Sequence, residues 1–241
     1  MPKRRLDALL VDRGFAESDK KAKALVMAGR VLVGERPVSK PGTLVDEHAN
    51  LQVVASDRYV SRGGDKLEHA LMAFGIDVTG LAAADIGAST GGFTDCLLQR
   101  GAVRVYAVDV GGGQLDYTLR TDPRVIVMER TNARLLDTLP EPVGIVTIDV
   151  SFISLRLVLP VARRLLARHG TIVALFKPQF EAAKNEVPRG GVLRDPLLHS
   201  TLIGRFATWA VSNGFHIIDL VASPILGAEG NREFFFRLRS L

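Results

Sequence analysis

The sequence is poor in the residues that mark secreted, metal-binding and membrane-spanning proteins. Its one cysteine, Cys96, excludes an intramolecular disulfide and a multi-thiolate zinc site, and its five histidines are scattered without metal-ligand spacing. No apolar run approaches the roughly 18–20 residues that a transmembrane helix needs. The basic start of the chain is not followed by the apolar core of a signal peptide. We therefore expect a cytoplasmic protein with no metal site and no membrane contact.

The positive charge is confined to one end of the chain. The net charge is +5, and residues 1–40 account for all of it, with ten Lys and Arg against five Asp and Glu. A concentrated basic end indicates a polyanion partner, because contacts to phosphates release counterions. An ordinary solvated surface is the alternative that charge alone leaves open.

The basic end has the pattern of a small folded module. The spacing predicts a helix over residues 6–15 and a second helix from an N-cap at Ser18 to Ala28, ended by Gly29. Short strands are expected at 31–33 and 51–54. This pattern predicts a small α+β domain over residues 1–57, a linker at 58–63 and a second domain at 64–241. The expected RNA-binding cations of the small domain are Arg4, Arg5, Lys20, Lys21, Lys23 and Arg30.

The segment "ESDKKAKALVMAGRVLVGERPVSKPGTLV" resembles the S4 domain, a small RNA-binding module. The matching positions are Ser18, Ala22, Leu25, Val26, residues 28–31 and Gly34. Many S4 domains have an arginine after the serine, where this chain has Asp19, so Lys20 or Lys21 would have to supply that phosphate contact. The resemblance implies an RNA partner, and a purely structural module is the alternative.

The rest of the chain alternates apolar strands with helices. One apolar strand is expected to end at residues 85–87, and further strands are expected near 103–109, 124–128, 143–149 and 171–177. A long helix near 196–212 and two strands near 215–222 and 232–239 are expected to follow. Strands rich in Val, Ile and Ala and separated by helices indicate buried parallel strands. The predicted fold class is therefore α/β, with a doubly wound Rossmann-like sheet.

A glycine-rich loop, "DIGASTGGFT" at residues 85–94, follows the first of these strands and opens a helix. Its spacing is neither the dinucleotide fingerprint G-x-G-x-x-G nor a P-loop. The next strand ends in Asp109, about twenty residues after the loop, where a carboxylate can accept both hydroxyls of an adenosine ribose. These features indicate adenosine joined to something other than a pyrophosphate.

The loop and Asp109 resemble the motifs of class I methyltransferases that use S-adenosyl-L-methionine. The resemblance implies that the loop holds the methionine part, that Asp109 holds the ribose and that Asn132 lies near the adenine; for Asn132 a simple turn residue is the alternative. The residues expected at the cofactor are Asp85, Gly87, Ala88, Ser89, Thr90, Gly91, Asp109 and Asn132.

Four charged residues stand where the ends of the elements are expected to converge. Lys66 starts a helix, Asp149 and Lys177 end the fourth and fifth strands, and Glu233 stands in the last strand. This order resembles the tetrad of FtsJ-type ribose 2′-O-methyltransferases; surface ion pairs are the alternative. We expect Lys177 to be the general base, with a pKa lowered by the second lysine and by burial. Lys66 would supply a positive field or position the ribose, and the two acids would orient the lysines.

Other features argue against methylation of a base. "DVSF" at residues 149–152 lacks the two prolines that amino-methyltransferases often carry there, and Cys96 is expected to be a small buried residue. The loop at 178–194 is rich in Gly, Pro and charge, and it is expected to act as a substrate lid. Arg189 and Arg194 in this loop are candidate phosphate contacts, with simple solvation as the alternative.

An S4 domain joined to an FtsJ-like domain resembles the TlyA family, also called haemolysin A-like proteins. The most specific stretches are "SRGGDKLEHAL", "DIGASTGGFTD", "DVSFISL", "KPQFE" and "GNREFFF". The family implies 2′-O-methylation of cytidine in ribosomal RNA, either naked or in a ribosomal subunit, and the chain end at Leu241 favours the type that modifies only the large-subunit RNA. A non-catalytic ribosome-assembly factor and a membrane-active haemolysin are the alternatives, and the oligomeric state stays open.

Overall fold

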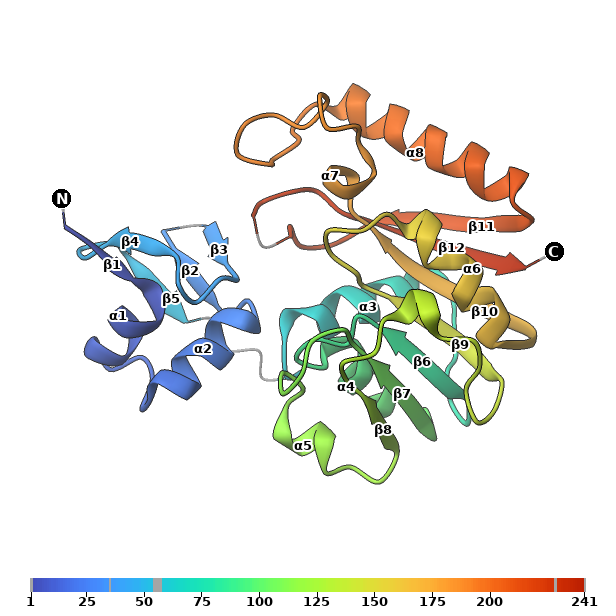
Figure 1. Ribbon diagram of the computed structural model, residues 1–241, viewed down its shortest axis with the longest axis horizontal. Coiled ribbons are helices and arrows are strands. Elements are labelled where there is room, and N and C mark those ends of the chain that lie inside the picture. Colours follow the sequence, from blue (N-terminus) through green and yellow to red (C-terminus); the bar gives the residue numbers. More distant parts are fainter. Residues whose placement is uncertain (1, 35, 54–57, 228, 241) are drawn as a thin grey trace.

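A computed structural model describes residues 2–34, 36–53, 58–227 and 229–240, which form a small and a large lobe (Figure 1). The small lobe contains α1 (Leu6–Asp12) and α2 (Asp19–Met27). Strand β1 (Lys3–Arg5) pairs with β4 (Leu44–Asp46), and β2 (Val31–Val33) lies between β3 (Arg36–Val38) and β5 (Leu51–Val53). This is the α+β module that the sequence predicts.

Local sequence signals set the ends of α2. Ser18 is its N-cap, and the Ser18 hydroxyl accepts a hydrogen bond from the Lys21 amide at 3.2 Å. Gly29 follows the helix at φ +68°, a left-handed conformation that glycine adopts without steric cost. Leu6 and Leu10 of α1, Val26 of α2 and Val31 of β2 are fully buried in one apolar cluster. The small lobe therefore has a core of its own.

The large lobe is built on a seven-stranded sheet with the order β11-β12-β10-β9-β6-β7-β8. Strands β6 to β10 all run parallel to one another. At one edge of the sheet, β12 runs antiparallel to β10, and β11 runs antiparallel to β12. The strands are β6 (Ala82–Ile86), β7 (Arg104–Val108), β8 (Val125–Met128), β9 (Val143–Ile148), β10 (Leu166–Phe176), β11 (Phe215–Ala222) and β12 (Phe234–Ser240). The chain order reverses between β6 and β9, the switch point at which open α/β sheets bind ligands.

Helices cover both faces of this sheet (Figure 1). Helices α3 (Arg62–Ala73), α4 (Gly92–Gln99) and α5 (Tyr117–Arg120) lie on one face, and α6 (Leu159–Leu165) and α8 (Pro196–Ser212) lie on the other. Along β9, Ile145 joins the first core cluster, whereas Val146 and Ile148 join the second. This two-residue alternation buries both faces of the strand, which confirms the predicted doubly wound fold.

Several elements differ from the sequence prediction. Strand β10 begins at Leu166, earlier than expected, because an irregularity in its pairing with β9 separates Leu166 from Thr171. Glu233 immediately precedes β12 rather than lying in it. A short 3-10 helix, η1 (Ala133–Leu135), follows β8, a second, η2 (Leu155–Leu157), follows β9, and α7 (Pro178–Glu181) follows β10.

The expected substrate lid at residues 178–194 is tied to the large lobe. The Asn231 side chain donates to the Gly191 carbonyl and accepts from the Leu193 amide, both at 2.9 Å. Arg205 pairs with Glu186 at 2.7 Å. The tip with Arg189 stays exposed, but both flanks of the loop are anchored.

None of the described helices combines the length and the apolarity that crossing a membrane would require.

Candidate active site

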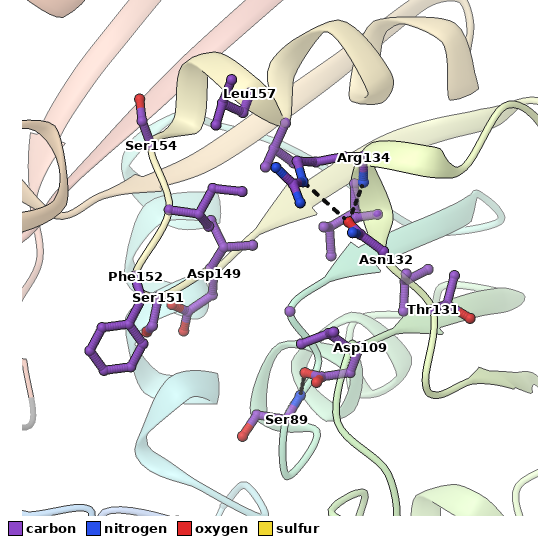
Figure 2. A pocket seen from close by; sticks show the side chains of 18 of the residues that line it. Ser89, Asp109, Thr131, Asn132, Arg134, Asp149, Ser151, Phe152, Ser154 and Leu157 are labelled. Atoms are coloured by element: carbon purple, nitrogen blue, oxygen red, sulfur yellow. Dashed lines mark hydrogen bonds between the residues drawn. The ribbon is translucent and has the colours of Figure 1, made fainter.

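A cavity of about 790 Å³ opens where β6, β7 and β9 end (Figure 2). Its lining includes Gly87, Ser89, Asp109, Asn132 and Asp149. Its volume lies within the range of about 300–1,000 Å³ that is common for small-molecule sites. We call it the cofactor cavity.

Glycines of the loop after β6 allow close approaches that other residues would block. A Cβ on Gly87 would lie 2.3 Å from the Asp149 carbonyl oxygen, and Gly87 has φ +90°. A Cβ on Gly91 would lie 2.2 Å from the Leu119 side chain, so Gly91 faces α5 instead of the cavity. Gly87 therefore brings the ends of β6 and β9 together, whereas Gly91 serves the packing of the start of α4 against α5 and, contrary to our expectation, does not line the cavity.

The Asp109 carboxylate is held at the floor of the cofactor cavity. One oxygen accepts a hydrogen bond from the Ser89 amide at 2.8 Å, and the other accepts from the Gly111 amide at 2.7 Å. Across the cavity, Asn132 caps η1 by accepting from the Arg134 amide at 3.1 Å (Figure 2). Both side chains thus have defined orientations toward the space where a nucleoside would lie.

Asp85 lies below this loop and outside the cavity lining. It is fully buried in β6, and its carboxylate accepts hydrogen bonds from Thr94 at 2.7 Å and Thr147 at 3.1 Å. Burial raises the pKa of Asp85 to about 7. The structure therefore places Asp85 as a support that joins β6, β9 and α4, unlike the cofactor contact that we expected.

A second cavity of about 200 Å³ lies between the two lobes. Residues 27–29 and Ser39 line it from the small lobe, and the loop residues Ala88 and Thr90 line it from the large lobe. Its remaining lining includes all four predicted catalytic residues: Lys66, Asp149, Lys177 and Glu233. We call it the acceptor cleft.

The four charged residues form two ion pairs in the acceptor cleft. Lys66 Nζ lies 2.5 Å from a Glu233 carboxylate oxygen, and their side chains are 10% and 3% exposed. Lys177 Nζ lies 2.7 Å from Asp149 Oδ1, with side chains 11% and 23% exposed. Lys177 also donates to the Ser151 hydroxyl at 2.9 Å. Sequence patterns grouped the four residues, but the structure assigns each lysine its acid.

The pKa of Lys177 moves in the opposite direction from our expectation. Burial favours the neutral amine, but the negative charges of Asp149 and Glu233 outweigh it and raise the pKa of Lys177 above its ordinary value. For Asp149, burial favours the neutral acid, but Lys177 and Lys66 outweigh it and lower the pKa of Asp149. The prediction was wrong because it counted the second cation and burial but not the two adjacent carboxylates.

The predicted RNA-binding cations fall into three groups. Arg4, Arg5, Lys21 and Lys23 pair with acidic side chains of the small lobe, namely Asp12, Asp7, Glu17 and Asp19. Arg30 donates to the Tyr59 carbonyl at 2.7 Å and so links the two lobes. Lys20, Arg189 and Arg194 are exposed and have no ion-pair or hydrogen-bond partner for their side chains in the part of the chain that the structure describes.

The loop after β9 contributes residues to which the sequence reasoning gave no role. Phe152 is 78% exposed at φ +64°, and its ring centroid lies 5.1 Å from that of Phe180. Glu181 anchors the loop by accepting from the Ser154 hydroxyl and the Leu155 amide, both at 2.7 Å. An aromatic residue three positions after the strand-end acid was the signal that the sequence offered for Phe152.

Two family models match this chain, one over each lobe. The model of the FtsJ-like methyltransferase family matches residues 59–240, and the model of the S4 domain matches residues 4–51. YqxC of Bacillus subtilis, named as a candidate rRNA methyltransferase, is 49% identical over 240 residues, covering 98% of this chain and 85% of that protein. TlyA of Mycobacterium tuberculosis H37Rv, named 16S/23S rRNA (cytidine-2′-O)-methyltransferase, is 48% identical over 242 residues, covering 98% and 90%.

Among solved structures, a candidate hemolysin from Streptococcus thermophilus is similar over the whole chain. It is 43% identical with a TM-score of 0.77, and the match covers 100% of this chain and 89% of that one. The family match thus spans the entire large lobe with its cofactor cavity and paired charges. This chain therefore belongs to the FtsJ-like methyltransferase family, in the group that includes TlyA.

Proposed function

We propose that this protein uses S-adenosyl-L-methionine to methylate the ribose 2′-oxygen of cytidine in ribosomal RNA, with large-subunit RNA as the first substrate to test. The observation that carries the proposal is the pair of lysine–carboxylate contacts in the acceptor cleft, next to a nucleoside-sized cavity. The names of TlyA and YqxC support ribosomal RNA as the substrate class.

The cofactor cavity fits S-adenosyl-L-methionine in shape and chemistry. The Asp109 carboxylate suits the ribose hydroxyls, Asn132 suits the adenine, and the backbone of residues 87–90 leaves room for the methionine part. The bound cofactor would supply a methyl group activated by a sulfonium, which departs as a thioether. Gly87, Ser89, Asp149 and Ser151 line both cavities, so they mark the place where methyl donor and acceptor would meet.

Lys177 is the proposed general base. In its neutral form, Lys177 Nζ would take the proton of the ribose 2′-hydroxyl while the oxygen forms its bond to the methyl carbon. Asp149 and Ser151 hold the amine in place, and Lys66, held by Glu233, would position the ribose. Because the pKa of Lys177 is raised, only a small fraction of the resting enzyme holds the neutral amine at pH 7.

The two lobes would divide the work between RNA binding and chemistry. We propose a small domain at residues 1–57 and a large domain at 64–241, joined by residues 58–63. Within this connection Tyr59 packs into the core of the large lobe and α3 begins at Arg62, and residues 54–57 lie outside the described residues. The exposed Lys20 of the small domain and the exposed Arg189 and Arg194 of the large domain are the cations most available to phosphates. The partner is ribosomal RNA, either free or in a ribosomal subunit, so the proposed place of action is the cytoplasm.

The direct test is methyl transfer to 23S and 16S rRNA, each naked and within its subunit. Labelled methyl donor and mass mapping of RNA fragments would locate the modified nucleotide. Lys177→Ala should lower the turnover rate by about 10²- to 10⁴-fold, as expected for loss of a general base. The exposed Lys184→Ala is the matched control and should keep full activity.

Calorimetric binding of the methyl donor distinguishes loss of chemistry from loss of fold. Lys177→Ala should bind the cofactor within about twofold of the wild type, since Asp109 and the loop are unchanged. Wild-type turnover in Lys177→Ala would refute the assignment of the base. Tight rRNA binding by a wild-type protein that transfers no methyl group would favour the ribosome-assembly role.

A further inference from the structure

Arg62 lines the acceptor cleft, where the two lobes face each other. It is the first residue of α3, one helical turn before Lys66, and it lines the cleft together with the end of α2. The contacts between Arg30 and Tyr59 and between Lys40 and Glu229 hold the small lobe against this side of the large lobe. A group bound in the cleft can therefore reach the Arg62 side chain.

Arg62 differs from the nearby Arg58 and Arg100 in forming no ion pair with any residue that the structure describes. Arg58 and Arg100 both form ion pairs with Glu68. Within the described residues, the Arg62 guanidinium forms no hydrogen bond or ion pair, and its Nε is buried. Two acids act on Arg62 through space: Glu233, whose carboxylate is bound to Lys66 at 2.5 Å, and Asp65, three residues further along α3. A partly buried guanidinium without a bonded partner keeps hydrogen-bond donors open to an anion that enters the cleft.

The backbone of the small lobe makes room for this guanidinium. A Cβ on Gly29 would lie 2.9 Å from both Nε and Nη2 of Arg62, closer than side chains pack. Gly29 thus ends α2 and also lets the small lobe approach Arg62 without covering the guanidinium with a side chain. Burial lowers the pKa of Arg62, but a guanidinium stays charged at neutral pH.

We propose that Arg62 binds a phosphate of the RNA backbone next to the ribose that is methylated, an inference that rests on the proposed function. The planar guanidinium can donate two parallel hydrogen bonds to phosphate oxygens, which fixes the position of the nucleotide as well as its charge. With the phosphate held at Arg62, the adjacent sugar lies within reach of Lys66 and Lys177, which line the same small cleft. The carboxylate of the methyl donor is the other anion that could meet this group.

The test compares Arg62→Gln with wild type in binding to purified 23S rRNA over a range of salt concentrations, without methyl donor. Loss of one phosphate contact should reduce the slope of log affinity against log salt by about 0.7–0.9. Affinity should fall about tenfold at low salt, as expected for loss of a charge-assisted contact. Arg62→Lys should keep the slope while losing part of the affinity, because it keeps the charge but not the planar fork.

A charge-matched control separates this contact from a general loss of positive charge. Arg168→Gln removes an exposed arginine near the start of β10, at the end of the strand opposite Lys177, and it should keep the wild-type slope. An unchanged slope in Arg62→Gln overturns the proposal, and an accompanying loss of methyl-donor affinity would assign Arg62 to the donor carboxylate. Because binding is measured without methyl transfer, an active enzyme with an unchanged slope refutes only this inference. A reduced slope in a protein that transfers no methyl group refutes only the proposed reaction.

Discussion

The two cavities of this protein differ in which lobes line them and in which groups orient their polar side chains. The cofactor cavity is formed entirely by the large lobe, and its polar side chains are oriented by backbone amides, as at Asp109 and Asn132. The acceptor cleft is formed by both lobes, and its polar side chains are oriented by each other, as Lys66–Glu233 and Lys177–Asp149. The cofactor cavity, whose polar side chains are oriented by the backbone, can bind its ligand without the small lobe. The acceptor cleft, whose charged side chains orient one another, responds to pH and to the substitution of any one of these side chains.

The strongest test of this contrast is the pH dependence of methyl transfer. Lys177 is protonated in the resting site because its pKa is raised, and the proposed base is the neutral amine. Below that pKa, the neutral fraction grows tenfold per pH unit, so kcat should rise about 100-fold between pH 6.5 and 8.5. Saturating cofactor and RNA isolate kcat, and the cofactor dissociation constant should change little over this range. A flat kcat profile would remove proton abstraction by Lys177 from the rate-limiting step.

Asp109→Asn should damage the cofactor cavity and leave the acceptor cleft intact. The uncharged amide weakens the hydrogen bonds to the ribose hydroxyls and loses one acceptor for the amides of Ser89 and Gly111. Loss of hydrogen bonds to a charged group should raise the dissociation constant of the methyl donor about 10- to 100-fold. Calorimetry measures this constant, with the exposed Asp137→Asn as the control. Equal loss of rRNA affinity in Asp109→Asn would show that the two cavities are not independent.

Glu181→Ala examines the loop that the two cavities share. Removing the carboxylate leaves the Ser154 hydroxyl and the Leu155 amide without their acceptor, which frees the loop that holds Ser151 and Phe152. We expect about a tenfold loss in kcat/KM, with a smaller loss in Glu181→Gln, which keeps one acceptor oxygen. Steady-state kinetics and thermal unfolding of both variants provide the measurement. Unchanged kinetics in Glu181→Ala would mean that the loop keeps its conformation without this anchor.

The smallest expected effects lie outside both cavities, on α2 of the small lobe. Lys20 has no acidic partner in the described chain, whereas Lys21 pairs with Glu17 at 3.0 Å. Lys20→Gln should weaken rRNA binding about threefold, and Lys21→Gln by less than about twofold, because an exposed ion pair already offsets part of the charge of Lys21. Filter binding at constant salt distinguishes the two. A larger effect at Lys21 would show that RNA displaces Glu17.

Prediction from the sequence worked best where the signal is local or periodic. The apolar run of β9, the N-cap at Ser18 and the glycine at the end of α2 are properties of short segments, and the corresponding elements form where expected. It worked less well where the outcome depends on neighbours distant in the chain. Asp85 stands in the cofactor motif, yet its carboxylate faces Thr94 and Thr147 inside the protein, because strand alternation at the end of β6 turns it away from the cavity.

The sequence by itself determined the two-part organisation, the class of each fold, the cofactor loop and the four charged residues of the acceptor cleft, because each depends on residue type, spacing and the ends of predicted strands. Only the tertiary structure decided which lysine pairs with which acid, the direction of the Lys177 pKa and the isolation of Arg62. Those properties depend on distances of a few ångströms between side chains up to 167 residues apart. Electrostatic interactions at such distances are set by packing, which spacing along the chain does not encode.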